Sequence, residues 1–90
     1  MILGFTATGW EDYLKLQADR RLVKKANKVI DDILRNPFEG IGKPEALKHD
    51  YAGYWSRRIT HAHRIVYRVY EDAEGHRVCR ILRCYGHYDD

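Results

Sequence analysis

Residues 54–71, YWSRRITHAHRIVYRVYE, decide the fold of this 90-residue chain. Two runs in this stretch, 54–60 and 63–71, are rich in β-branched and aromatic residues, as strands are. Only His61-Ala62 separates them. Two such runs on either side of a tight turn predict a β-hairpin.

The run 63–71 also predicts which face of the sheet is buried. Its side chains form two alternating sets, Ile65, Tyr67 and Val69 on one side and Arg64, Val66 and Arg68 on the other. Because successive side chains of a strand point to opposite faces, one face is expected to pack against helices and the other to be basic. By the same alternation Arg58 falls on the basic face, where it can meet Arg64 across the hairpin.

A third strand is expected over residues 77–85, after a glycine-containing turn at 72–76. It extends the hairpin into an antiparallel meander. Its two cysteines, Cys79 and Cys84, are five positions apart, about 16 Å along a strand, which is too far for an intrachain disulfide. They are therefore predicted to be packing residues.

The first part of the chain predicts one strand followed by two helices. The apolar run 1–6 precedes Thr8 and Glu11, which match a capping box. A second helix with apolar residues at helical spacing is expected to begin at Asp19 and to end before Pro37. Together these elements predict an α+β fold in which an N-terminal strand and a helical hairpin pack on one face of a small antiparallel sheet.

Length and composition limit the classes of protein that remain. Ninety residues allow one domain, residues 1–90, with a single core. No apolar run approaches the length of a membrane span, and no signal-peptide pattern opens the chain, so a cytoplasmic location is expected. The net charge is +3, and residues 54–70 contain four arginines and no carboxylate. This pattern favours a polyanionic partner such as nucleic acid.

Residues able to cleave RNA without a metal lie around this basic face. The long loop 37–53 contains Glu45, and Gly86-His87-Tyr88 lies near the C-terminus. RNA cleavage by the 2′-hydroxyl needs a base, a cation that stabilises the charged phosphorus centre and an acid for the leaving 5′-oxygen. A carboxylate, an arginine and an imidazole can fill these roles. His61 and His63 lack a third metal ligand at suitable spacing, and no metal or cofactor is expected.

Several segments resemble the Txe/YoeB family of the RelE superfamily. They are Trp10-Glu11-Asp12-Tyr13, the run 36–49 (NPFEGIGKPEALKH), the run 53–60 (GYWSRRIT), the run 63–67 (HRIVY) and Gly86-His87-Tyr88. Their order and spacing cover almost the whole chain. The resemblance implies the toxin of a bacterial type II toxin–antitoxin system, a ribosome-dependent mRNA endoribonuclease with a microbial-ribonuclease-like fold.

The resemblance also assigns roles to individual residues. It implies Glu45 as the general base, Arg64 as the stabiliser of the transition state, and His87 as the general acid beside Tyr88. The RNA-binding residues are expected to be Lys43, Lys48, Arg57 and Arg58. Two carboxylates, Asp89-Asp90, extend the chain beyond the terminal tyrosine of the family.

The expected partners are a YefM-like antitoxin, the ribosome with its mRNA, and a second copy of the chain. Trp10 and Trp55 lie at periodic apolar positions, which predicts core packing or a dimer contact. One alternative function remains open, a non-catalytic module that binds RNA or the ribosome. A DNA-binding protein is a weaker alternative, since no helix-turn-helix pattern is present.

Overall fold

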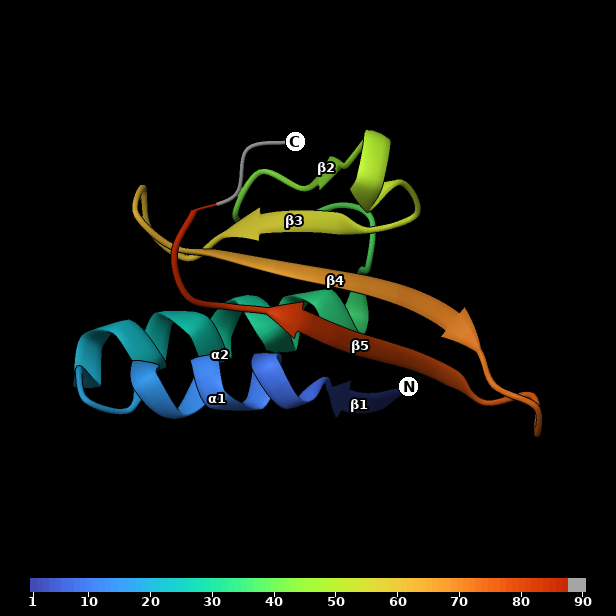
Figure 1. Ribbon diagram of the computed structural model, residues 1–90, viewed down its shortest axis with the longest axis horizontal. Helices are drawn as coiled ribbons and strands as arrows, with labels where there is room; N and C mark the ends of the chain where they lie inside the picture. Colours follow the sequence, from blue (N-terminus) through green and yellow to red (C-terminus); the bar gives the residue numbers. More distant parts are fainter. Residues whose placement is uncertain (88–90) are drawn as a thin grey trace.

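The computed structural model describes residues 1–87 of the chain. The elements in chain order are β1 (Ile2–Phe5), α1 (Ala7–Leu16), α2 (Arg20–Arg35), β2 (Glu45–Ala46), the 3₁₀ turn η1 (His49–Tyr51), β3 (Trp55–Arg58), β4 (Arg64–Glu71) and β5 (Arg77–Arg83). The predicted α+β class, with two N-terminal helices on a sheet, is confirmed (Figure 1).

The five strands form one mixed sheet in the order β1-β5-β4-β3-β2. The three predicted strands form the antiparallel meander expected of them, whereas β1 pairs with β5 in parallel. The prediction of a purely antiparallel sheet was therefore wrong at this edge. The parallel pairing arises because β1 leads into two helices, so the chain enters the sheet from the same end in β1 and β5.

Both helices begin at side-chain caps, but the first cap differs from the prediction. Thr6, not Thr8, caps α1, and its hydroxyl accepts a hydrogen bond from the backbone N–H of Gly9. The same hydroxyl donates to the Leu82 carbonyl of β5, so the helix begins where β1 leaves the sheet. Asp19, where the second helix was predicted to begin, is the N-cap of α2 and accepts hydrogen bonds from two backbone N–H groups of the first turn.

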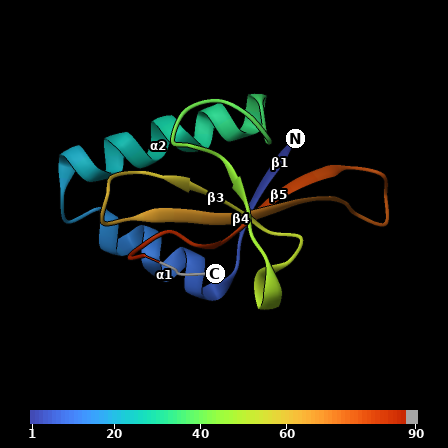
Figure 2. The same ribbon diagram turned by 90° about the horizontal axis from the view of Figure 1, so that it is seen from above.

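The core lies between α2 and one face of the sheet. Figure 2 shows α2 along one side of the sheet and the η1 turn on the other. The buried residues of α2 are Ala26, Val29, Ile30 and Ile33, and they share one apolar cluster with Ile65, Tyr67, Cys79, Ile81 and Cys84. The inward set predicted for β4 is confirmed, and so is the packing role of the two cysteines.

The tryptophans lie outside the buried core. Trp10 is 49% exposed and packs against the rings of Phe5 and Tyr13 at the surface. Of its two predicted roles, core packing is therefore wrong, and a dimer contact stays a prediction. Trp55 is half-buried beneath Phe38, with their ring centroids 5.0 Å apart. Within residues 1–87, no helix has the length and apolar character to cross a membrane.

Gly9 provides a test of how α1 is seated on β5. A methyl group added at this position would lie 2.4 Å from the carbonyl oxygen of Ile81, closer than real contacts allow. Replacing glycine by alanine inside a helix ordinarily stabilises it by about 0.5–1 kcal/mol. We expect the opposite sign for Gly9→Ala, a lower free energy of unfolding in urea.

Gly4→Ala is the matched control, since a methyl group there would meet no atom within 4 Å. It should leave the unfolding midpoint near that of the parent. A Gly9→Ala variant more stable than the parent would show that α1 does not approach β5 this closely.

Candidate active site

Strand register brings the predicted base to the basic face. Glu45 of β2 lies opposite Ser56 of β3, which in turn lies opposite Val66 of β4. Arg58 and Arg64 are direct cross-strand partners in the β3–β4 hairpin, as predicted. Side chains at paired positions share a face, so these five residues lie on the face of the sheet opposite α2.

Glu45 and Arg64 form the centre of this face. The Arg64 Nη1 lies 3.6 Å from Oε2 of Glu45 and 3.5 Å from the hydroxyl of Ser56. The Glu45 side chain is 63% exposed, whereas that of Arg64 is only 14% exposed. Among residues 1–87, the buried Nε of Arg64 finds no hydrogen-bond partner. A solvent-accessible carboxylate therefore lies beside a largely desolvated guanidinium with a donor to spare.

The segment after β5 is fastened to the start of β4. The Gly86 N–H donates to Nδ1 of His63, and the Arg64 N–H donates to the Gly86 carbonyl, both at 2.9 Å. The rings of His63 and Tyr85 also pack together, with centroids 4.5 Å apart. His87 is thus the residue directly after a backbone bonded to Arg64, and it is exposed. Tyr88 lies outside the described residues.

His63 is a supporting residue that sequence reasoning missed. From the sequence it was considered as a metal ligand, but in the structure it is half-buried and holds the chain end through Gly86. A single sequence gives no signal for this role, because the contact joins residues far apart in the chain. No group of three His, Cys, Asp or Glu side chains within residues 1–87 is placed to hold a metal ion.

Three of the four cations predicted to bind RNA are exposed. Lys43, Lys48 and Arg58 all reach the surface. Lys43 has a left-handed backbone with φ 53°, which is strained for a residue with a side chain. Together with Arg58 it borders an open groove of about 500 Å³ between α2 and the end of β3.

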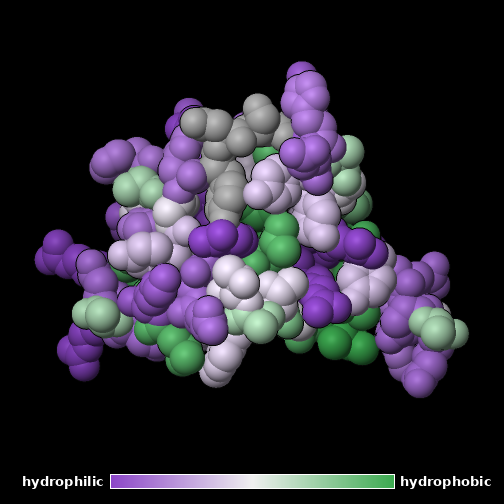
Figure 3. All heavy atoms as spheres, viewed as in Figure 1, coloured by the Kyte–Doolittle hydropathy of each residue, from purple (hydrophilic) through white to green (hydrophobic). Residues whose placement is uncertain are grey.

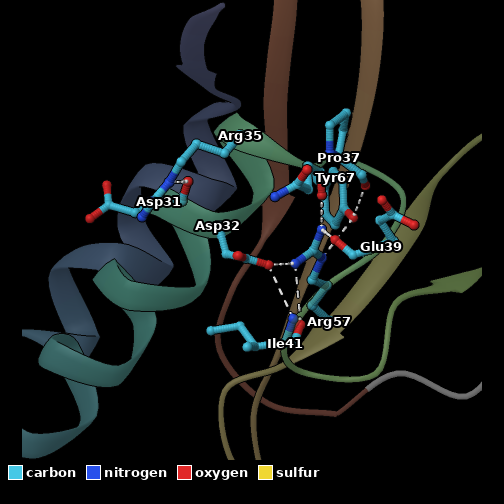
Figure 4. A network of polar contacts seen from close by, with 9 residues as sticks. Asp31, Asp32, Arg35, Pro37, Glu39, Ile41, Arg57 and Tyr67 are labelled. Atoms are coloured by element: carbon cyan, nitrogen blue, oxygen red, sulfur yellow. Dashed lines mark hydrogen bonds and ion pairs between the residues drawn. The ribbon is translucent and has the colours of Figure 1, made fainter.

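Arg57 does not fit its predicted role in RNA binding. The residue is fully buried and lies on the opposite face from Arg58, pointing at α2 (Figure 4). Its Nη1 contacts Oδ2 of Asp32 at 2.5 Å, and its Nε donates to the hydroxyl of Tyr67 at 3.2 Å. The side chain is therefore a structural element of the core, unavailable to a ligand on the basic face.

The Arg57 guanidinium also organises the loop that leads to Glu45. It donates to the backbone carbonyls of Asn36, Glu39 and Ile41. The Tyr67 hydroxyl donates to a fourth carbonyl of this loop, that of Pro37. We call these contacts, together with Asp32, the Arg57 network. Buried backbone groups need hydrogen-bond partners, and this loop has no helix or sheet to provide them. The Arg57 network provides partners for the loop carbonyls instead.

The buried cysteines are not reactive groups. Desolvation by burial raises the pKa of Cys79 to about 11 and that of Cys84 to about 12. Both thiols stay protonated at neutral pH, and the thiolate is the nucleophilic and metal-binding form. Their place in the fold is consistent with packing alone.

Comparison with known proteins identifies the family to which this sheet and loop belong. Residues 5–88 match a family model described as the YoeB-like toxin of bacterial type II toxin–antitoxin systems. The toxin YoeB of Escherichia coli K12 is 52% identical over 81 residues, which cover 89% of this chain and 96% of that protein. This chain belongs to the YoeB toxin family.

Solved YoeB structures share the fold over nearly the whole chain. A YoeB/ParE toxin from Agrobacterium tumefaciens superposes with a TM-score of 0.90 at 47% identity, covering 98% of this chain and 100% of that one. A YoeB dimer from Staphylococcus aureus gives a TM-score of 0.83 at 42% identity, with 98% of each chain covered. The S. aureus toxin is also known in a heterotetrameric YoeB–YefM complex.

The Arg57 network yields a prediction for stability. Removing one partner of a buried ion pair leaves the other groups unpaired and costs about 3–5 kcal/mol. We expect Arg57→Ala to lower the free energy of unfolding by this amount in urea titrations. The matched control is Arg58→Ala, an exposed neighbour for which a change within about 0.5 kcal/mol is expected. Equal stability of the two variants would remove Arg57 from its structural role.

A second prediction concerns acid pH. The hydrogen bond from Arg57, followed by that from the Ile41 amide, lowers the pKa of Asp32 below its ordinary value of 3.8. A carboxyl with a lowered pKa in the folded state contributes stability that is present above the unfolded pKa and lost as the pH falls through the folded pKa. We therefore expect the unfolding free energy of Asp32→Asn to fall less steeply below about pH 4.

The comparison variant for this pH series is Asp31→Asn, which removes the neighbouring carboxylate of α2 and leaves the contact between Asp32 and Arg57 in place. Urea unfolding at a series of pH values measures all three proteins. Identical slopes for Asp32→Asn and the parent would mean that Asp32 does not couple folding to pH.

Proposed function

We propose that this YoeB-family toxin is a ribosome-dependent mRNA endoribonuclease that acts by attack of a 2′-hydroxyl on the adjacent phosphate. The observation that carries the proposal is the pairing of Glu45 with Arg64 at 3.6 Å on the face of the sheet opposite α2. A carboxylate and a guanidinium this close can act on the same phosphodiester, one as a proton acceptor and the other as a stabiliser of negative charge.

Glu45 is suited to act as the general base. Its carboxylate is exposed, so a ribose can approach it, and it accepts the proton of the 2′-hydroxyl. The freed 2′-oxygen then forms a bond to phosphorus. Because Arg64 remains beside the carboxylate, base and phosphate can be bound at the same time.

Arg64 is suited to stabilise the transition state. The pentavalent phosphorus centre carries more negative charge than the starting phosphodiester, and preorganised donors aimed at that charge are most effective where water is excluded. The Arg64 guanidinium is largely desolvated, and its unpartnered Nε offers a donor that a phosphate oxygen could satisfy. Its backbone is fixed by the bond to Gly86.

His87 is suited to act as the general acid. When the bond from phosphorus to the 5′-oxygen breaks, that oxygen needs a proton, and imidazole can hold and release one near neutral pH. The products are a 2′,3′-cyclic phosphate and a 5′-hydroxyl, so no external nucleophile is consumed. Tyr88, the next residue, completes the proposed catalytic set. Lys43, Lys48 and Arg58 are proposed to hold flanking phosphates.

We also propose two protein partners. The S. aureus relative is known as a dimer and in complex with YefM, which supports a second copy and a YefM-like antitoxin as partners of this chain. An acidic segment of the antitoxin would match the groove between α2 and β3, where cations border an apolar floor. The groove is lined by Lys25, Lys28, Val29, Ile41, Gly42, Lys43, Arg58, Ile59 and Thr60.

Substitution of the central pair tests the function. We expect Glu45→Gln and Arg64→Ala each to slow message cleavage on ribosomes by about a hundredfold or more, since each removes one proton-transfer or charge-stabilising group. Primer extension on a translated message measures the rate. Cleavage by the parent should continue when a chelator is added to ribosomes kept intact by polyamine.

Glu74→Gln is the matched control, because it neutralises an exposed carboxylate in the β4–β5 turn and should leave the rate unchanged. Thermal unfolding checks that each variant folds. If Glu45→Gln cut as fast as Glu74→Gln, Glu45 would not be the general base. If the parent itself cut no message on ribosomes, the non-catalytic binding module would become the better description of the chain.

A further inference from the structure

A second pocket lies on the same face of the sheet as Glu45 and Arg64. Its volume is about 250 Å³, and it is lined by Thr6, Tyr54, Arg68, Tyr70, Arg80 and Leu82. We call it the Arg68–Arg80 pocket. The face turned toward the viewer in Figure 3 carries strongly hydrophilic residues, with residues of intermediate hydropathy and some hydrophobic ones between them. None of the catalytic roles proposed above uses this pocket.

The two arginines of the pocket form an unfavourable pair within the fold. Arg68 of β4 and Arg80 of β5 are direct cross-strand partners, and both are exposed. Like charges at such positions destabilise a sheet. Neither forms an ion pair with a carboxylate of residues 1–87, and no carboxylate lines the pocket. The charge of the pair is therefore not neutralised by a carboxylate of the described residues, and an external anion could neutralise it.

The tyrosines give the pocket a second kind of chemistry. The Arg68 guanidinium lies 4.5 Å from the ring centroid of Tyr70 and 5.9 Å from that of Tyr54. Flat guanidinium and aromatic groups are the surfaces on which the bases of single-stranded nucleic acids stack. Two cations beside two such rings match a nucleotide, whose phosphate is anionic and whose base is planar.

The position of the pocket connects it to the proposed cleavage site. Arg68 follows Arg64 by four residues on β4, so it lies on the same face about 13 Å away. Gly4, the partner of Arg80 on β1, has no side chain, and a Cβ there would meet nothing within 4 Å. The sheet surface is therefore open beside the pocket, and an RNA strand that passes Arg64 can reach it.

We propose that the Arg68–Arg80 pocket binds a nucleotide of the message that flanks the cut site. This inference rests on the proposed RNase function and adds a subsite to it. An acidic peptide would satisfy the two arginines but would leave the tyrosine surfaces without a planar partner, which favours RNA. The base stacks on Tyr70 or Tyr54, and its phosphate pairs with Arg68 and Arg80.

Binding of short 2′-O-methylated RNA to the free protein tests the pocket without cleavage. In fluorescence anisotropy we expect Arg68→Ala and Arg80→Ala to weaken binding about tenfold and each to reduce the salt slope of the affinity by about one. Arg77→Ala is the matched control, since it removes an exposed arginine of β5 that does not line the pocket. Its affinity should stay within about twofold of that of the parent.

A second pair of variants separates stacking from charge. Tyr70→Phe keeps the ring and should bind like the parent, whereas Tyr70→Ala should lose affinity with an unchanged salt slope. Thermal unfolding should show that Arg68→Ala is folded, because removal of the like-charge pair offsets the loss of the Arg68 ring contacts. Weaker RNA binding then cannot be ascribed to unfolding.

The outcomes distinguish this pocket from the proposed RNase function. Glu45→Gln should retain RNA binding while cleavage is lost. If ribosomal cleavage depends on Glu45 but Arg68→Ala and Arg80→Ala bind RNA like Arg77→Ala, the pocket proposal is overturned and the RNase proposal stands. The same conclusion follows if these variants lose only binding of an acidic antitoxin segment. If they lose RNA affinity although the parent cuts no message on ribosomes, the RNase proposal fails and the pocket stands as an RNA-binding site.

Discussion

The buried guanidinium of Arg57 is the interaction on which the rest of the structure depends. It joins α2 to β4, because it contacts Asp32 of α2 and the Tyr67 hydroxyl of β4. It also donates to three backbone carbonyls of the loop that connects α2 to β2. That loop has no regular structure before Glu45, so its course is fixed by these side-chain bonds. The Glu45 carboxylate reaches Arg64 because the loop is held at its beginning by Arg57 and at its end by the pairing of β2 with β3.

The two faces of the hairpin thus separate the arginines of one sequence run into a buried structural residue and residues that are proposed to bind RNA. Arg57 points into the core and is satisfied completely, whereas Arg58, Arg64 and Arg68 lie on the open face with few internal partners. Cations that the fold does not need are available to a polyanion, and their mutual repulsion is relieved when it binds. The proposed site combines them with a carboxylate on the edge strand β2 and an imidazole that follows the inner strand β5.

Much of the fold could be predicted because it depends on local patterns. Alternation in β4 gave the correct buried face, and the cap at Asp19 and the stop at Pro37 bounded α2. The parallel pairing of β1 and the anchoring of Gly86 by His63 could not be predicted, since they join segments more than twenty residues apart. Arg57 was predicted to bind RNA although the same alternation places it with Trp55 on the inner face. Charge was given more weight there than periodicity.

In the proposed reaction the nucleophile is a 2′-hydroxyl of the message, deprotonated by Glu45. Ribosomal cleavage of a message that carries a single 2′-deoxynucleotide on the 5′ side of the mapped cut tests this step. This phosphodiester should no longer be cut, while the unmodified message should yield a downstream fragment with a 5′-hydroxyl. Cleavage of the deoxy-substituted bond at the unmodified rate would contradict this step, because water would then have to be the nucleophile.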